Sequence, residues 1–158
     1  MRKLILFDID GTLARGGPAK EAFGVAMMAT FGTVGTIESF DFSGKTDPQI
    51  ARELLVAANV DDSVIDTGLP VLWNSYISEL KTRIVANPMK LLPGVGDLIE
   101  NLHLADDVAL GLVTGNIARG ARIKLGSVGL AEHFHVGGYG CDHEVRDHLP
   151  GIALDRAA

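Results

Sequence analysis

Residues 4–13 read LILFDIDGTL and place two carboxylates directly behind an apolar run. An almost unbroken apolar run over residues 3–9 is typical of a strand buried on both faces of a parallel sheet. Asp8 and Asp10 lie two residues apart, so extended backbone points both side chains to the same side. Ligands of open α/β sheets bind beyond the carboxyl ends of the strands, and charges beside an apolar strand are costly unless they are paired or hold a metal. Asp8 and Asp10 are therefore the first candidate site residues.

The rest of the chain changes its pattern once, after residue 88. Residues 16–88 show helical spacing with little strand signal, and later residues alternate between helix and strand. Helices are expected over 20–31, from 46, over 62–85 with a break or new start at Pro70, from 93, over 117–128 and over 149–157, and strands over 3–9, 108–113 and 134–136. This order predicts an α/β core built from residues 1–15 and 89–158, with an inserted helical domain at 16–88.

Composition narrows the classes of partner. Hydrophobic residues make up 47% of the 158 residues, which is enough for a packed core. The net charge of −6, without a basic run, argues against nucleic acid, and no apolar stretch is long enough for a membrane helix. The single cysteine, Cys141, cannot form an internal disulfide, and no signal peptide pattern is present. We expect a cytoplasmic protein with no nucleic-acid or membrane partner.

The segment from Asp8 to Leu13 resembles the first motif of the haloacid dehalogenase-like (HAD) superfamily, Asp-x-Asp-Gly-Thr-Leu/Val. The resemblance implies a Rossmann-like parallel sheet with an inserted all-helical cap at 16–88. It also implies that Asp8 attacks phosphorus to form an aspartyl-phosphate, and that Asp10 protonates the leaving oxygen and then activates water. Mg²⁺ would be held by the Asp8 carboxylate and the Asp10 backbone carbonyl. Dehalogenases of this superfamily lack an acid at the second position, so Asp10 indicates phosphoryl transfer.

Further candidate residues follow from the same resemblance. Thr114 ends the second long strand, and its hydroxyl with the N–H groups of Gly115 and Asn116 would hold a phosphate oxygen. Two basic residues compete to stabilise the phosphoryl group. Arg146 precedes the last helix, where the family usually has Lys followed by Pro, in a loop similar to one in phosphoglycolate phosphatases. Lys124 is the alternative, but a lysine in mid-helix is usually solvated, so Arg146 is preferred.

The inserted domain resembles the small cap of the phosphoglycolate phosphatase and β-phosphoglucomutase-like subgroup. Its loop Gly44-Lys45-Thr46-Asp47 is similar to the loop that faces the substrate, so Lys45 is a candidate specificity residue. A helix-capping turn explains the same four residues equally well.

One family motif is missing. The acidic pair Gly-Asp-x-x-x-Asp does not follow another buried strand, and Asp155 cannot replace it because Asp155 falls on the last helix. In the family that strand pairs with strand one, so we expect residues 3–7 to form an exposed edge that favours self-association. We hypothesise that these residues are the N-terminal part of a longer protein.

The predicted function is a Mg²⁺-dependent phosphatase that acts on a small phosphorylated metabolite, phosphoglycolate-like or a sugar phosphate. A phosphomutase of sugar phosphates is the first alternative, because Asp8 and Asp10 serve both reactions. An inactive fragment or a partner-binding module that retains the fold is the second.

Overall fold

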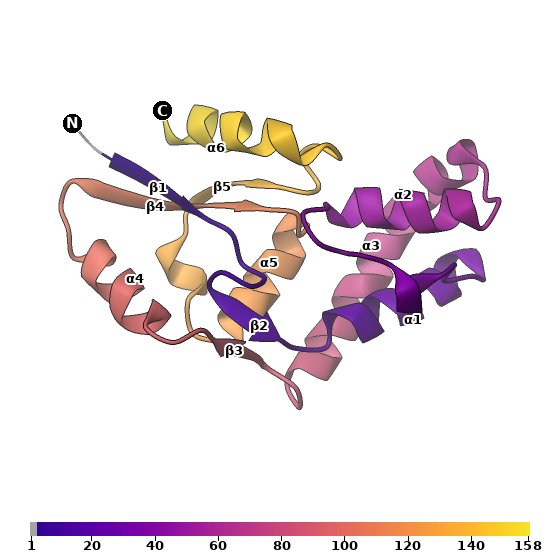
Figure 1. Cartoon of the computed structure of the whole chain (residues 1–158), viewed down its shortest axis with the longest axis horizontal. Helices are drawn as coiled ribbons and strands as arrows, with labels where there is room; N and C mark the ends of the chain where they lie inside the picture. The colour runs from indigo at the N-terminus through magenta and orange to yellow at the C-terminus, as the bar shows by residue number, and fades with distance from the viewer. Residues whose placement is uncertain (1–2) are drawn as a thin grey trace.

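The computed structural model describes residues 3–158 as a parallel sheet flanked by helices and a separate group of three helices (Figure 1). The strands are β1 (Lys3–Phe7), β2 (Ala14–Gly16), β3 (Met89–Leu91), β4 (Val108–Thr114) and β5 (Val136–Tyr139). The helices are α1 (Ala19–Phe31), α2 (Asp47–Ala57), α3 (Asp62–Ile84), α4 (Val95–His103), α5 (Ala118–Gly126) and α6 (Leu149–Ala157), with 3₁₀ turns η1 (Ile37–Ser39), η2 (Ala131–His133) and η3 (Arg146–His148). The chain thus has an α/β fold.

The main sheet has the order β1-β4-β5, and its strands are parallel. Helix α6 covers one face, and α4 and α5 cover the other (Figure 1). Helices therefore cover both faces, which explains the continuous apolar runs of the strands. Burial is deep in the middle of β4, whereas the side chains of β1 stay partly exposed, so the expectation of a strand fully buried on both faces is wrong for β1. Within residues 3–158, β1 pairs on one side only and forms an edge of the sheet. All three strands run toward α1, α2 and α3, so their carboxyl ends face the helical group.

Strand β5 is displaced from its expected position. It runs from Val136 to Tyr139 rather than over 134–136, and it includes the glycine pair Gly137-Gly138. A Cβ atom at Gly138 would clash with the carbonyl oxygen of Leu149 at the start of α6. The glycines therefore serve close packing of the helix on the strand, which sequence alone cannot distinguish from a turn.

Helix α3 is continuous through Pro70, so the expected break at this residue is wrong. A proline inside a helix costs roughly 3 kcal/mol, because it removes a hydrogen bond and crowds the preceding turn. Along α3 large side chains are buried in the helical group, at Ile65, Leu72, Tyr76 and Leu80. Burying each contributes roughly 1.5–3 kcal/mol, so packing outweighs the local cost of the proline.

The helical group forms a cap that joins the core through two short strands. β2 and β3 pair antiparallel, with Ala14 opposite Leu91, where the chain leaves and re-enters the core. Three-residue strands leave no periodic pattern, so they were not expected from sequence. The cap has its own hydrophobic cluster, and Ile117 of the core belongs to it. No helix within residues 3–158 is long and apolar enough to cross a membrane.

Candidate active site

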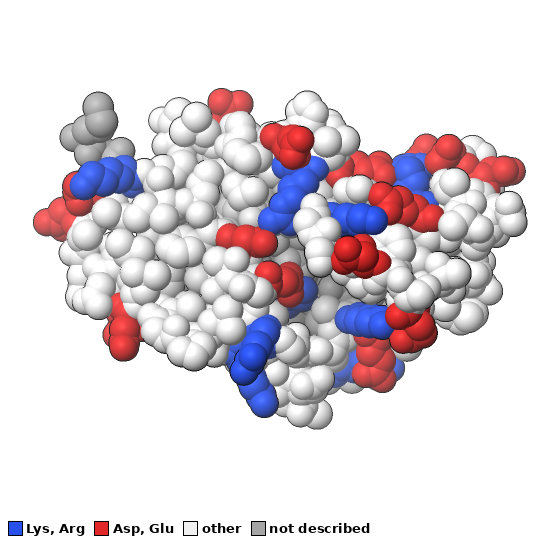
Figure 2. Space-filling view, in the orientation of Figure 1, with Lys and Arg blue, Asp and Glu red and all other residues white. Residues whose placement is uncertain are grey.

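A cavity of about 350 Å³ lies between the carboxyl ends of β1 and β4 and the cap. Figure 2 shows basic and acidic side chains gathered around a hollow between the two parts of the molecule. The cavity is lined by the core residues Asp8, Asp10, Thr114, Gly115, Asn116, Lys124 and Arg146, and by the cap residues Ala19, Lys20, Phe23, Phe42, Ser43, Gly44, Lys45, Asp47, Ile50 and Tyr76. The structure thus brings every candidate site residue of the sequence to one place.

Asp8 follows β1 directly and is paired with Arg146. One carboxylate oxygen accepts a hydrogen bond of 2.8 Å from the backbone N–H of Ile9. The other lies 2.9 Å from Nη2 of Arg146. Arg146 therefore points into the cavity rather than toward its acidic neighbours in the loop. Its guanidinium lies where it can contact a phosphoryl group carried by Asp8.

Asp10 is paired with Lys124, a residue that we expected from the sequence to be exposed to solvent. That expectation is wrong, because Lys124 is only 5% exposed and its Nζ lies 2.9 and 3.2 Å from the two Asp10 oxygens. Asn116 donates a further hydrogen bond of 2.7 Å to Asp10. Partial burial opposes ionisation of Asp10, but the charge of Lys124 and these hydrogen bonds outweigh it and lower the pKa of the carboxyl. Helix α5 turns the lysine inward, and a periodic pattern cannot show which face of a helix meets the site.

Thr114 ends β4 with its hydroxyl inside the site. Its Oγ1 accepts hydrogen bonds from the Asn116 backbone N–H at 3.2 Å and the Asn116 side-chain amide at 2.7 Å. Both residues are buried. Since a hydroxyl has one proton and two lone pairs, two accepted bonds leave the Thr114 proton available for an anionic oxygen.

Asp47, at the start of α2, joins the cap to the turn at residues 114–117, which follows the end of β4. Its carboxylate accepts a hydrogen bond of 2.8 Å from the backbone N–H of Ile117, and its own N–H donates to Gly115 O at 2.8 Å. Burial raises the pKa of Asp47 to about 6, and the charge of Asp10 adds to this, although Lys124 and the N–H of Ile117 oppose it. The sequence placed Asp47 at a helix start and in the loop that resembles the substrate-facing loop of the family, but it assigned the residue no partner. The contacts lie 70 residues away, so no local signal could have revealed them.

The cap contributes two lysines to the cavity. Lys45 Nζ lies 2.6 Å from Glu53 and 4.4 Å from the centre of the Phe40 ring. Lys20 was not predicted, and it pairs with Glu38 at 3.0 Å. Both ammonium groups already have partners, so they are held near the cavity rather than free in solution.

The cap loop at residues 43–46 lies directly against the turn at residues 114–117. A Cβ atom at Gly115 would clash with the carbonyl oxygen of Lys45. Glycine at this position is therefore required for the close approach of cap and core.

The oxygen donors of the site fit Mg²⁺ with few protein ligands. Within residues 3–158, no three His, Cys, Asp or Glu side chains gather in a metal-binding arrangement. The Asp8 carboxylate and the Asp10 backbone carbonyl are the hard oxygen donors that Mg²⁺ prefers, and this ion commonly takes its other ligands from water and substrate phosphate. The Asp10 carboxylate is already bound by Lys124 and Asn116. Asp155 is exposed on α6 and does not join the site.

Comparison with known proteins identifies one family and several similar folds. The family described as haloacid dehalogenase-like hydrolase matches residues 5–145. No curated protein sequence matches the chain. The fold is similar to CbbY from Rhodobacter sphaeroides in complex with phosphate, at 19% identity and a TM-score of 0.60 over 89% of this chain.

Two further solved structures share the fold. One is a candidate phosphoglycolate phosphatase from Lactobacillus plantarum, with 21% identity and a TM-score of 0.55 over 90% of this chain. The other is a candidate β-phosphoglucomutase from Thermotoga maritima, with 21% identity and a TM-score of 0.52 over 99% of this chain. The chain spans 64% of the length of CbbY, 63% of the Lactobacillus protein and 70% of the Thermotoga protein.

Proposed function

Because this chain belongs to the haloacid dehalogenase-like hydrolases, we propose that it is a Mg²⁺-dependent phosphatase that hydrolyses a small phosphomonoester. The observation that carries the proposal is the pairing of each carboxylate with its own cation. Arg146 lies beside Asp8 and Lys124 beside Asp10, with the free proton of Thr114 in the same cavity. Two cations and a hydroxyl donor around two aspartates suit a reaction in which negative charge grows on phosphoryl oxygens.

In the proposed reaction a carboxylate oxygen of Asp8 attacks phosphorus, and the bond from phosphorus to the ester oxygen breaks. Asp10 gives its proton to the departing oxygen. It then takes a proton from water, whose oxygen attacks the aspartyl-phosphate and releases inorganic phosphate. Mg²⁺ bound by Asp8 and the Asp10 carbonyl would neutralise phosphate charge.

The two basic residues have different partners in this scheme. Arg146 stabilises the phosphoryl oxygens beside Asp8, as the sequence predicted. Lys124 keeps Asp10 ionised when the site is empty, which suits the step in which Asp10 acts as a base. The acid step requires a proton on Asp10, and an incoming anionic phosphate favours it because a nearby like charge raises the pKa of a carboxyl.

The cavity also limits the substrate. About 350 Å³ suits a small metabolite rather than a polymer. Lys20 and Lys45 on the cap side would favour a substrate with an anionic or strongly polar far end, as in phosphoglycolate or a sugar phosphate. We propose the cytoplasm as the compartment, since Cys141 is an exposed free thiol.

A phosphomutase is the second candidate. The contact between the cap loop and Gly115 is so close that a single Cβ would disrupt it. If the cap closes over the rest of the site as tightly, it would exclude water, and exclusion of water favours transfer of the phosphoryl group to a sugar hydroxyl.

Phosphate release from a panel of phosphomonoesters, with and without Mg²⁺, tests the proposal. The panel contains phosphoglycolate and several sugar phosphates. We expect Mg²⁺-dependent release from at least one compound, and loss of release in Asp8→Asn with an unchanged circular dichroism spectrum. No release by the wild-type protein from any compound with Mg²⁺ present would reject the phosphatase. Interconversion of sugar phosphates in the presence of a bisphosphate activator would instead support the mutase.

A further inference from the structure

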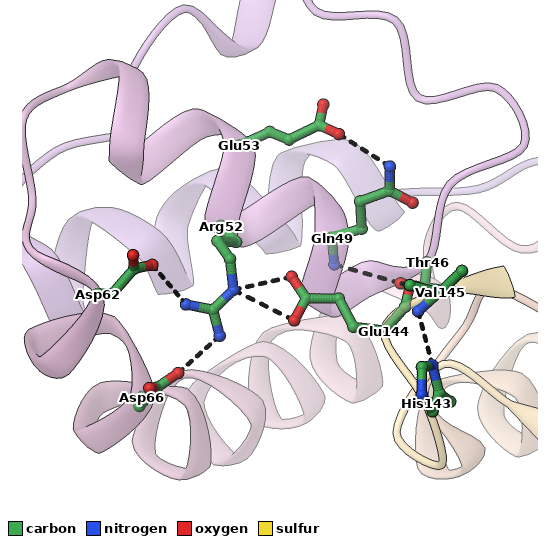
Figure 3. A network of polar contacts seen from close by, with 9 residues as sticks. All are labelled: Thr46, Gln49, Arg52, Glu53, Asp62, Asp66, His143, Glu144 and Val145. Atoms are coloured by element: carbon green, nitrogen blue, oxygen red, sulfur yellow. Dashed lines mark hydrogen bonds and ion pairs between the residues drawn. The ribbon is translucent and has the colours of Figure 1, made fainter.

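An arginine of the cap is bound by acids from two sides. Nε of Arg52, on α2, lies 2.8 and 3.1 Å from the two carboxylate oxygens of Glu144 in the core (Figure 3). Its Nη1 lies 2.8 Å from Asp62 and its Nη2 lies 2.6 Å from Asp66, both on α3. The two α3 acids orient the guanidinium within the cap, so that its Nε–H faces Glu144 of the core.

The backbone of Glu144 is bound by the same helix. Thr46, the N-cap of α2, donates its hydroxyl to the carbonyl oxygen of Glu144 at 2.6 Å. The same hydroxyl accepts a hydrogen bond of 3.2 Å from the Gln49 backbone N–H (Figure 3). Thr46 is fully buried, and both bonds are partly shielded from water. Helix α2 thus holds Glu144 at its side chain and at its main chain.

The residue that meets Asp8 lies only two positions further along. Arg146 Nη2 contacts the Asp8 carboxylate at 2.9 Å. Between the two, the N–H of Val145 donates to His143 Nδ1 at 2.9 Å and folds the loop locally. The loop is attached to the core at Asp142, which binds Arg156. The segment is attached to the core before Arg146, at Asp142, and after it, at the fully buried Leu149 that begins α6. Between these two points the cap binds it at Glu144.

We propose that Arg52 and Glu144 couple closure of the cap to the placement of Arg146 beside Asp8. Neither residue lines the cavity, so both are positioning residues that act through Arg146. When the cap moves away, Glu144 loses the Arg52 and Thr46 contacts together. Arg146 then loses the support that its loop receives from the cap. The effect of this coupling on kcat rests on the proposed phosphatase function. Its effect on the rigidity of the loop at residues 143–147 does not depend on that function.

If the pair of Arg52 and Glu144 only stabilised the fold, its loss would have the same effect as the loss of any similar ion pair. Arg52 and Glu144 are partly exposed, and exposed pairs contribute little to stability. Arg83 provides a matched control, since it lies on α3 and pairs with Glu79 at 3.0 Å and Glu21 at 2.6 Å. These contacts lie entirely within the cap. Loss of the Arg83 contacts therefore removes a similar ion pair without a link to the core.

Hydrogen exchange of residues 143–147 tests the coupling without any substrate. In Arg52→Gln and Glu144→Gln we expect faster amide exchange in this loop, and in Arg83→Gln unchanged exchange there. Equal exchange in all three variants and the wild-type protein would overturn the proposal, even if the protein is a phosphatase. Faster exchange in a protein that releases no phosphate would uphold the coupling and reject the proposed function.

Kinetics in two backgrounds test whether the pair acts through Arg146. In the wild-type background, Glu144→Gln should lower kcat by roughly tenfold to a hundredfold, the size expected when a group that contacts the transition state is misplaced. In an Arg146→Ala background the same change should have an effect below about twofold, because the shared target is already gone. Equal losses in both backgrounds would overturn the route through Arg146. Arg83→Gln should leave kcat unchanged in either background.

Discussion

Replacing Asp47 with asparagine should increase the free energy of unfolding at neutral pH. Asp47 is buried between the cap and the core, and burial raises its pKa from the ordinary value of 3.8 to about 6. Asparagine retains an oxygen that can accept the hydrogen bond from Ile117, which is 2.8 Å long in the wild-type protein. The substitution therefore removes the buried negative charge and preserves the contact that the charge makes.

The size of the effect follows from the two pKa values of Asp47. Between about pH 4 and pH 6 the folded protein retains a proton that the unfolded chain has released, so stability falls as the pH rises through this window. One pKa unit corresponds to about 1.4 kcal/mol, and a difference of roughly two units costs about 3 kcal/mol above the window. Below about pH 4 both states are protonated and the cost disappears.

Urea denaturation of both proteins at about pH 4 and about pH 7 measures this cost. The free energy of unfolding of Asp47→Asn minus that of the wild type should be about 3 kcal/mol larger at pH 7 than at pH 4. Asp97→Asn is the control, because it removes an exposed acid from the first turn of α4 and should show no such difference. A difference that is equal at the two pH values, or larger at pH 4, would refute the reasoning.

Three further predictions concern the site and the sheet edge. Lys124→Met should raise the pKa of Asp10, because the lysine charge lowers this pKa in the wild-type protein. NMR titration of the Asp10 carboxyl carbon measures the pKa, and an unchanged pKa in the variant would contradict the prediction. Gly115→Ala should destabilise the protein by about 1–3 kcal/mol, because the added Cβ clashes with the cap loop. Gly126→Ala is the control and should not destabilise the protein, because its Cβ meets open space. Equal midpoints of urea denaturation for the two variants would argue against the clash. We also propose that the edge of β1 pairs with the β1 edge of a second copy of the chain. Sedimentation should then show oligomers of the wild-type protein and weaker association of Leu4→Lys. A wild-type protein that is monomeric at all concentrations would reject this pairing.

The parts of the fold that could be predicted from sequence are those with long, uniform patterns. Strand β1 and helix α6 were expected nearly where they lie. The errors have a common physical origin in packing between distant segments. Pro70 is tolerated because α3 is buried in the cap, and Gly138 lies in a strand because α6 approaches it closely. Neither contact can be predicted from the residues that neighbour Pro70 or Gly138 in the sequence.

The candidate site divides in the same way. Asp8 and Asp10 follow a strand and Thr114 ends one, and parallel strands bring their carboxyl ends to one edge, so the sequence places these residues together. The chemistry expected of them came from the resemblance of residues 8–13 to the first motif of the family. The partners of these residues depended on the fold. Lys124 contacts Asp10 because it lies on the side of α5 that faces the site. Asp47 contacts Ile117 because the cap packs against the core. Arg146 was expected near the phosphate, but its link to the cap through Glu144 and Arg52 was not.

The stretch LILFDIDGTL therefore specified, without any tertiary information, an apolar strand of an α/β protein that is followed by two carboxylates. The residues that do this are adjacent, and their geometry follows from the two-residue repeat of extended backbone. Tertiary structure alone decided the charge environment of those carboxylates. Lys124 lies 114 residues from its partner Asp10, and Arg146 meets Asp8 through a loop that α2 holds in place. Coulombic and hydrogen-bond energies depend on distances of a few ångströms in space, and separation along the chain does not contain that information.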